Sequence, residues 1–202
     1  MDLIVKMKFG SHLYGTNTVH SDVDYKGVFL PSKKELLLGA VPKCRNFSTN
    51  LGAQKNSQDD IDEEIYSLHY FLKLACQGQT VAIGYVLPII SKFYDDYGQR
   101  AKQAAENKNI DWKAVSHALR AAIQTKEILV NGAIHYPLKD APFLLKVKSG
   151  RLDYINEVAP ALEALMDEVE TLVNASDLPE QVDTEYWDDF LCEVLETSRF
   201  KE

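Results

Sequence analysis

The sequence predicts an α+β fold in which a small sheet is followed by a helical C-terminal region. Two features of the chain support this prediction. Short apolar runs that are rich in β-branched and aromatic residues, and are bounded by turn residues, occur before residue 100, as is typical of strands. Beyond that point the apolar residues recur at helical spacing. A chain of 202 residues with 46% hydrophobic residues is also long enough to bury a core.

Three segments are predicted to be strands of one sheet: residues 3–9, 23–30 and 61–66. The stretch between the second and the third mixes Pro, Lys, Asn, Ser and Gln, and only residues 36–38 suit a helical turn. We expect most of residues 46–60 to form a surface loop.

A helix is predicted directly after the third strand. Its apolar side chains follow the i, i+3, i+4, i+7 spacing and a glycine can end it: Leu68, Phe71, Leu72, Ala75 and Gly78. Residues 81–90 are apolar on all sides and are expected to be buried, whereas residues 91–109 are polar and helix-prone. Further helices are predicted at residues 111–130, 154–174 and 184–196.

The composition excludes several classes of protein. With a formal net charge of −8, the chain does not suit a broadly basic surface that holds nucleic acid. Its three cysteines lie far apart and form no CxxC pair, which disfavours a disulfide framework and a zinc site and fits a reducing cytosol. Charged residues break any apolar run at the N-terminus, so neither a signal peptide nor a membrane span is predicted. We therefore expect a soluble, cytoplasmic protein.

Two carboxylates mark the start of the second predicted strand. Asp22 and Asp24 are two residues apart, so a strand places both on one face, while Val23 points to the other face. Such close carboxylates repel one another, and a divalent cation such as Mg²⁺ relieves this repulsion. A solvated turn is the alternative. Upstream, Gly10-Ser11 ends the first strand, where backbone N–H groups and a hydroxyl could approach a phosphate closely.

These residues resemble the signature of a known superfamily. Gly10-Ser11, ten intervening residues, and then Asp22-Val23-Asp24 before an apolar strand are similar to the motif of DNA polymerase beta-like nucleotidyltransferases. The fuller strings GSHLYG and SDVDYKGV resemble a narrower group, the predicted nucleotidyltransferases associated with RNA repair. Further similarity lies in the segments Tyr66-Ser67-Leu68 and His117-Ala118-Leu119-Arg120. The resemblance implies a mixed sheet with flanking helices, followed by the helical C-terminal region.

The strand signals end before residue 100, which predicts a domain boundary there, and the resemblance implies a third carboxylate. Residues 1–100 are expected to form the nucleotidyltransferase domain, and residues 101–202 a helical domain that packs on the active site. In the superfamily a third acid on a neighbouring strand completes the metal site, and Asp62, four residues ahead of Tyr66, matches its position. Glu64 shares a face with Asp62 on a strand and is the alternative third ligand. An acidic run on an exposed edge is the competing interpretation.

Other candidate residues lie outside the carboxylates. His117 and Arg120 share one face of a predicted helix and could contact the nucleotide or the acceptor, although an ordinary polar surface is the alternative. A small basic cluster could contact phosphates: Lys139, Lys146, Lys148 and Arg151. His12 and Tyr14 are expected in the loop after Gly10-Ser11, near the nucleotide. Where the group often has an acid, this chain has Gln79-Thr80 and then Gly84.

The function that the resemblance implies is transfer of a nucleoside monophosphate from an NTP, with ATP preferred, to a hydroxyl acceptor, with RNA among the candidates. Asp22, Asp24 and Asp62 would hold two Mg²⁺ or Mn²⁺ ions. Gly10, Ser11, His117 and Arg120 would contact the nucleotide. The alternatives are a non-catalytic nucleotide- or partner-binding module with the same fold, and a purely structural interaction protein.

Overall fold

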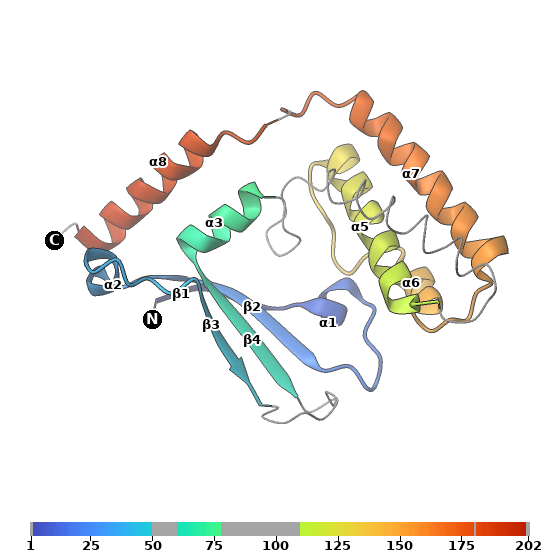
Figure 1. The fold of residues 1–202 in the computed structure, drawn as a ribbon, viewed down its shortest axis with the longest axis horizontal. Helices are drawn as coiled ribbons and strands as arrows, with labels where there is room; N and C mark the ends of the chain where they lie inside the picture. Colours follow the sequence, from blue (N-terminus) through green and yellow to red (C-terminus); the bar gives the residue numbers. More distant parts are fainter. Residues whose placement is uncertain (1, 50–59, 78–109, 180, 201–202) are drawn as a thin grey trace. The chain divides into compact units, whose positions relative to one another are not determined.

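The computed structural model describes residues 2–49, 60–77, 110–179 and 181–200, which are drawn in colour in Figure 1. The chain divides into two compact units. The first contains residues 1–13, 17–85 and 179–202, and the second contains residues 14–16 and 86–178. The predicted domain boundary near residue 100 lies outside the described residues and stays a prediction.

The first unit is built on a four-stranded sheet with strand order β1-β2-β4-β3. Its strands, drawn as arrows in Figure 1, are β1 (Asp2–Lys8), β2 (Val23–Leu30), β3 (Cys44–Ser48) and β4 (Ile61–Ser67). β1 runs antiparallel to β2, β2 runs parallel to β4, and β3 runs antiparallel to β4. The expected mixed sheet is therefore confirmed, and so are the three predicted strands.

The strand β3 was not predicted, and the loop expected over residues 46–60 is wrong for its first residues. This strand is polar, with Phe47 as its one large apolar side chain, and it lies at the edge of the sheet. Its backbone pairs with β4 from Cys44 opposite Tyr66 to Ser48 opposite Asp62. An edge strand needs no apolar alternation when the ladder to its neighbour holds it. Residues 50–59 of the expected loop lie outside the described residues.

The chain after β1 also differs from the expectation. A short helix, α1 (Gly10–Tyr14), follows β1, so His12 and Tyr14 lie on a helix rather than in a loop. A second short helix, α2 (Lys33–Leu37), begins three residues before the predicted turn. Ser32 and Glu35 form a capping box at its N-terminus, which fixes where the helix begins. The two helices are too short for apolar periodicity to reveal them.

The core of the first unit lies where β2 and β4 pair. Phe29 is fully buried on one face of the paired strands, where Ile65 is buried too, and Val28 and Tyr66 are buried on the other face. On its other side β2 pairs with β1, and Gly27 lets these two strands approach, because a Cβ at this position would lie 2.5 Å from the carbonyl oxygen of Val5. The charged residues of β2 and β4 lie at the other end of the pair, where these two strands begin.

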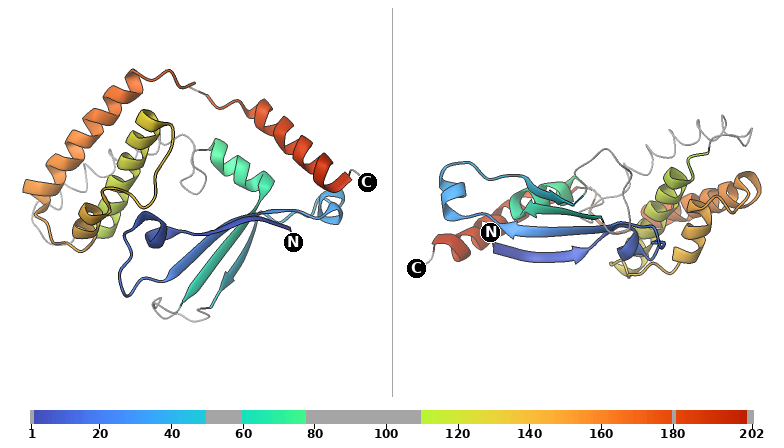
Figure 2. Two further views of the ribbon diagram at one scale, coloured as in Figure 1. Left: turned by 180° about the vertical axis from the view of Figure 1, so that it is seen from behind. Right: turned by 90° about the horizontal axis from the view of Figure 1, so that it is seen from below.

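Two helices accompany the sheet. α3 (Leu68–Cys76) follows β4 directly, with Ser67 capping its N-terminus, and confirms the predicted helix; Gly78 lies outside the described residues. α8 (Thr184–Leu195), also predicted, continues into a π-helical turn, η2 (Glu196–Phe200). Figure 2 shows α8 beside α3, far from it in sequence.

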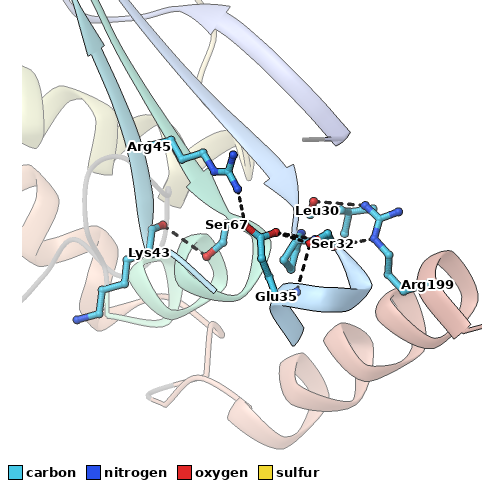
Figure 3. A network of polar contacts seen from close by, with 8 residues as sticks. Leu30, Ser32, Glu35, Lys43, Arg45, Ser67 and Arg199 are labelled. Carbon is cyan, nitrogen blue, oxygen red and sulfur yellow. Dashed lines mark hydrogen bonds and ion pairs between the residues drawn. The ribbon is translucent and has the colours of Figure 1, made fainter. Parts of the chain in front are cut away.

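Polar contacts tie α2 and the C-terminal turn to the sheet (Figure 3). Arg45 on β3 donates to Glu35 at 2.5 Å, and the hydroxyl of Ser67 donates to the carbonyl oxygen of Lys43 at 3.4 Å. Arg199 donates to the carbonyl oxygens of Pro31 at 2.7 Å and Leu30 at 3.3 Å. The same guanidinium lies 2.7 Å from the Asp2 carboxylate. Arg199 therefore connects the C-terminal turn with the ends of β1 and β2.

We expect Arg199→Met to loosen this C-terminal turn. The side chain of Arg199 is only 14% exposed and its charge is hydrogen-bonded to backbone carbonyls, so its loss should cost about 2 kcal/mol. Hydrogen exchange of residues 184–200 should become faster. Arg45→Met is the control, because Arg45 is 41% exposed and such surface ion pairs contribute below about 1 kcal/mol. Equal exchange in both variants would contradict the anchoring role of Arg199.

The second unit is helical, as the sequence predicts. Its helices are α5 (Trp112–Asn131), α6 (Ala141–Lys148) and α7 (Ala159–Asn174), with a π-helical turn, η1 (Tyr154–Val158), before α7. They enclose a core of side chains that are almost fully buried: Val115, Leu119, Ala122, Leu144, Val147, Val158 and Val169. None of the helices in the described ranges is long and apolar enough to cross a membrane.

The helix α6 was not predicted. It has eight residues, and Pro142 at its second position starts it. Proline suits a first helical turn because no intrahelical bond needs its N–H there. The predicted apolar segment 81–90 and the polar, helix-prone segment 91–109 lie outside the described residues.

Candidate metal centre

Three carboxylates converge at one end of the paired strands β2 and β4. Asp22 precedes β2, while Asp24 and Asp62 are each the second residue of their strand. One carboxylate oxygen of each lies within 4.8 Å of the others. All three side chains are half-buried. The arrangement brings together the three predicted ligands.

The parallel pairing of β2 with β4 creates this arrangement. Its register places Asp24 directly opposite Asp62. The N–H of Val23 donates to the carbonyl oxygen of Asp60 at 3.0 Å, which extends the pairing beyond the strand ends. Directly opposite residues on neighbouring strands point to the same face. The local period of two then adds Asp22 to the same face.

The electrostatics of the site favour a bound cation. Burial raises the pKa of Asp24 above its ordinary value, and the charges of Asp22 and Asp62 raise it further, while Lys26 lowers it. Carboxylate oxygens in this number and spacing are suited to Mg²⁺ or Mn²⁺, which also keep positions for water and phosphate oxygens. The donor set therefore fits a divalent ion.

The pKa of Asp24 gives a test in the absence of divalent ions. A carboxyl group whose pKa is raised by folding favours the folded state below the ordinary aspartate pKa and opposes it above the folded-state pKa. Asp24→Asn should therefore stabilise the metal-free protein at neutral pH. Because Asp24 is partly solvated, we expect a gain of about 1 kcal/mol or less, or about 2–4 °C in Tm.

This gain should shrink as the pH is lowered through the range in which aspartates become protonated. Thermal unfolding in a chelator, measured from neutral to acidic pH, provides the measurement. Asp177→Asn, at an exposed position of the second unit, is the control. A lower Tm for Asp24→Asn than for the wild type at neutral pH would contradict the raised pKa of Asp24.

Glu64, the alternative third ligand, is engaged elsewhere. It forms an ion pair with Lys26, and the hydroxyl of Tyr66 donates to its Oε2 at 2.8 Å. The hydrogen bond from Lys26 lowers the pKa of Glu64 below its usual value. Burial and the neighbouring Glu64 raise the pKa of Tyr66. Asp62 thus lies with the aspartate pair, whereas Glu64 pairs with a lysine. Nothing in the local sequence pattern indicates that Lys26 pairs with Glu64.

Gly10 lies against the carboxylates. It is the first residue of α1, with a φ of 60°, and a Cβ at this position would be 2.2 Å from Oδ2 of Asp24. The N–H of Phe9 donates to the backbone oxygen of Asp24 at 2.8 Å, which fixes the approach. Ser11 follows as the second residue of α1. Only glycine fits at position 10 without displacing the Asp24 carboxylate.

His117 and Arg120 lie on α5 in the second unit. The Arg120 guanidinium stacks over the ring of the buried Tyr14, 4.0 Å from its centroid. Lys148 donates to the carbonyl oxygen of Thr16 at 3.3 Å. Desolvation and then the charges of Arg120, Lys113 and Lys148 lower the pKa of His117. Arg120, Lys113 and Lys148 therefore place positive charge near His117 in the second unit. Contact of His117 and Arg120 with a nucleotide stays a prediction.

Comparisons with known proteins find one similar family and one similar phage protein. Residues 1–91 match the family model described as RlaP, RNA repair pathway DNA polymerase beta family. An uncharacterised 38.9 kDa protein from the nrdC-mobD intergenic region of Enterobacteria phage T4 is 28% identical over an alignment of 333 positions, which covers 98% of this chain and 99% of the phage protein. No solved structure matches the chain. The segment of this chain that is similar to that family contains Gly10 and all three aspartates.

Proposed function

We propose that this protein is a metal-dependent nucleotidyltransferase that transfers a nucleoside monophosphate from an NTP to a hydroxyl acceptor. The convergence of Asp22, Asp24 and Asp62 on one face of the sheet carries the proposal. The family match over the same residues supports it. In the reaction the acceptor oxygen forms a bond to the α-phosphorus, the bond to the bridging oxygen breaks, and pyrophosphate leaves.

The three aspartates have different roles in this proposal. Bound divalent ions would assist the attacking hydroxyl and neutralise the charge on the triphosphate and the departing pyrophosphate. Asp22 and Asp24 would contribute oxygens to both ions. Asp62, on the neighbouring strand, would hold the ion on the side of the attacking hydroxyl. The three carboxylates would thus position the triphosphate and the acceptor hydroxyl relative to each other.

The residues around the aspartates would hold the triphosphate. Gly10 leaves room beside Asp24, so that backbone N–H groups and the Ser11 hydroxyl can donate to phosphate oxygens. His117 and Arg120, on α5, are the further residues that we propose bind the nucleotide, and Lys113 and Lys148 add positive charge near His117. We take ATP as the preferred donor and RNA as the first acceptor to test.

The test uses the full chain with Mg²⁺ or Mn²⁺ and each NTP labelled at the α-phosphate. We expect pyrophosphate release that a chelator abolishes, with the label recovered on an RNA that has a free 3′ hydroxyl. Label on the protein itself would instead identify a protein hydroxyl as the acceptor. Nucleotide binding in a calorimeter without any turnover would favour the non-catalytic module and overturn the proposal.

A further inference from the structure

A pair of oppositely charged residues lies on β2 and β4, two residues after Asp24 and Asp62. Lys26 is two residues after Asp24 on β2, and Glu64 is two residues after Asp62 on β4. The parallel register places Lys26 opposite Glu64, just as it places Asp24 opposite Asp62. All four side chains therefore point to the same face. The face carries four carboxylates, including Asp22, and one lysine among them.

The Lys26 ammonium group is held from several sides. It pairs with Oε2 of Glu64 and lies 3.2 Å from the hydroxyl of Tyr66. The rings of Phe9 and Tyr66 lie 5.3 Å and 5.4 Å from it, within the range of cation–π attraction. The lysine side chain is 21% exposed. These contacts restrict its movement far more than a single surface ion pair would.

Glu64 is the more exposed member of this ion pair. Its side chain is 44% exposed and has one more methylene group than an aspartate. It is close enough to Asp24 for its charge to act on that carboxyl, yet it stands outside the group of three that could share a metal ion. Its Oε2 accepts from both Lys26 and Tyr66. These two hydrogen bonds hold the Glu64 carboxylate beside Lys26 and Tyr66 rather than among the aspartates.

We propose that Lys26 is a positioning residue that withholds Glu64 from the metal centre, so that the centre has three carboxylates and keeps Asp62 as its third ligand. This inference rests on the proposed function, in that the aspartates must bind a divalent ion. A fourth carboxylate would strengthen ion binding through its charge. It would also occupy a position that water and phosphate oxygens need. Lys26 therefore lowers the affinity for the ion and leaves coordination positions open.

The test measures Mn²⁺ affinity by calorimetry and paramagnetic resonance, without any substrate. Lys26→Met removes the positive charge and releases Glu64, and should tighten binding by about five- to tenfold. Glu64→Gln keeps the lysine and leaves its charge uncompensated, and should weaken binding by a similar factor. The double variant restores the net charge and should return to within about threefold of the wild type. Turnover should fall in Lys26→Met despite the tighter binding.

A matched control lies on the opposite face of the sheet. Lys6 forms an ion pair with Glu63, the residue that follows Asp62, so Lys6→Met makes the same change in net charge. It should alter Mn²⁺ affinity by less than about twofold, because Glu63 points away from the centre. Equal effects of Lys6→Met and Lys26→Met would overturn the inference, as would unchanged affinity in both Lys26→Met and Glu64→Gln. Absence of Mn²⁺ binding to the wild type would instead overturn the proposed metal centre itself.

Discussion

Replacing Asp24 with asparagine should lower metal-dependent pyrophosphate release by about a thousandfold or more. The amide of asparagine has one neutral oxygen, so in the proposed mechanism both ions would lose a charged ligand. Stabilisation by metal ions contributes several kcal/mol to such reactions, and about 4 kcal/mol corresponds to a factor of about a thousand. Asp22→Asn should have an effect of the same order. Initial rates with each NTP, together with Mn²⁺ affinity, provide the measurement.

The control for this prediction is Glu63→Gln. Glu63 is adjacent to Asp62 on β4, but it pairs with Lys6 on the other face of the sheet. Its loss removes the same charge, so turnover should stay within about threefold of the wild type. The prediction is wrong if folded Asp24→Asn turns over NTP at the rate of Glu63→Gln. Circular dichroism and the melting temperature establish that each variant is folded.

The two effects expected of Asp24→Asn have opposite signs, and this combination is diagnostic. The same substitution that should lower turnover should stabilise the metal-free protein at neutral pH, because it removes a partly buried charge and its repulsion from Asp22 and Asp62. A residue placed for stability alone would give a loss of both. Sites that concentrate like charges for chemistry commonly oppose the stability of the fold.

Local spacing was sufficient to predict part of the candidate site. Asp22 and Asp24 share a face because a strand has a period of two, whatever the rest of the chain does. The predicted helices that contain residues 111–130, 154–174 and 184–196 also followed from local periodicity. In each case the relevant contacts lie within one element. Information of this kind is present in any short window of the sequence.

Contacts between distant strands could not be predicted in the same way. Asp62 was placed through the family resemblance, and its position opposite Asp24 depends on a parallel register between β2 and β4. A shift of one residue would turn Asp62 to the other face. The pairing of Lys26 with Glu64 depends on the same register. The strand β3 was missed because its residues are held by β4 rather than by their own pattern.

Gly10→Ala should reduce turnover by about a hundredfold while the protein stays folded. A Cβ at this position would lie 2.2 Å from Oδ2 of Asp24, so either the carboxylate or the start of α1 must move. A displacement of about 1 Å in a catalytic group can cost about a hundredfold in rate. Mn²⁺ affinity should fall as well, because the displaced oxygen belongs to the candidate metal centre.

Gly39→Ala separates this steric effect from backbone strain. Gly39 has the same φ of 60°, but a Cβ there would meet nothing within 4 Å. Both substitutions force alanine into the left-handed region, which costs about 1 kcal/mol of stability. Only the change at position 10 presses on Asp24, so Gly39→Ala should retain wild-type turnover and metal affinity. Equal loss of turnover in the two variants would attribute the effect to strain, and Gly10 would then have no part in shaping the centre.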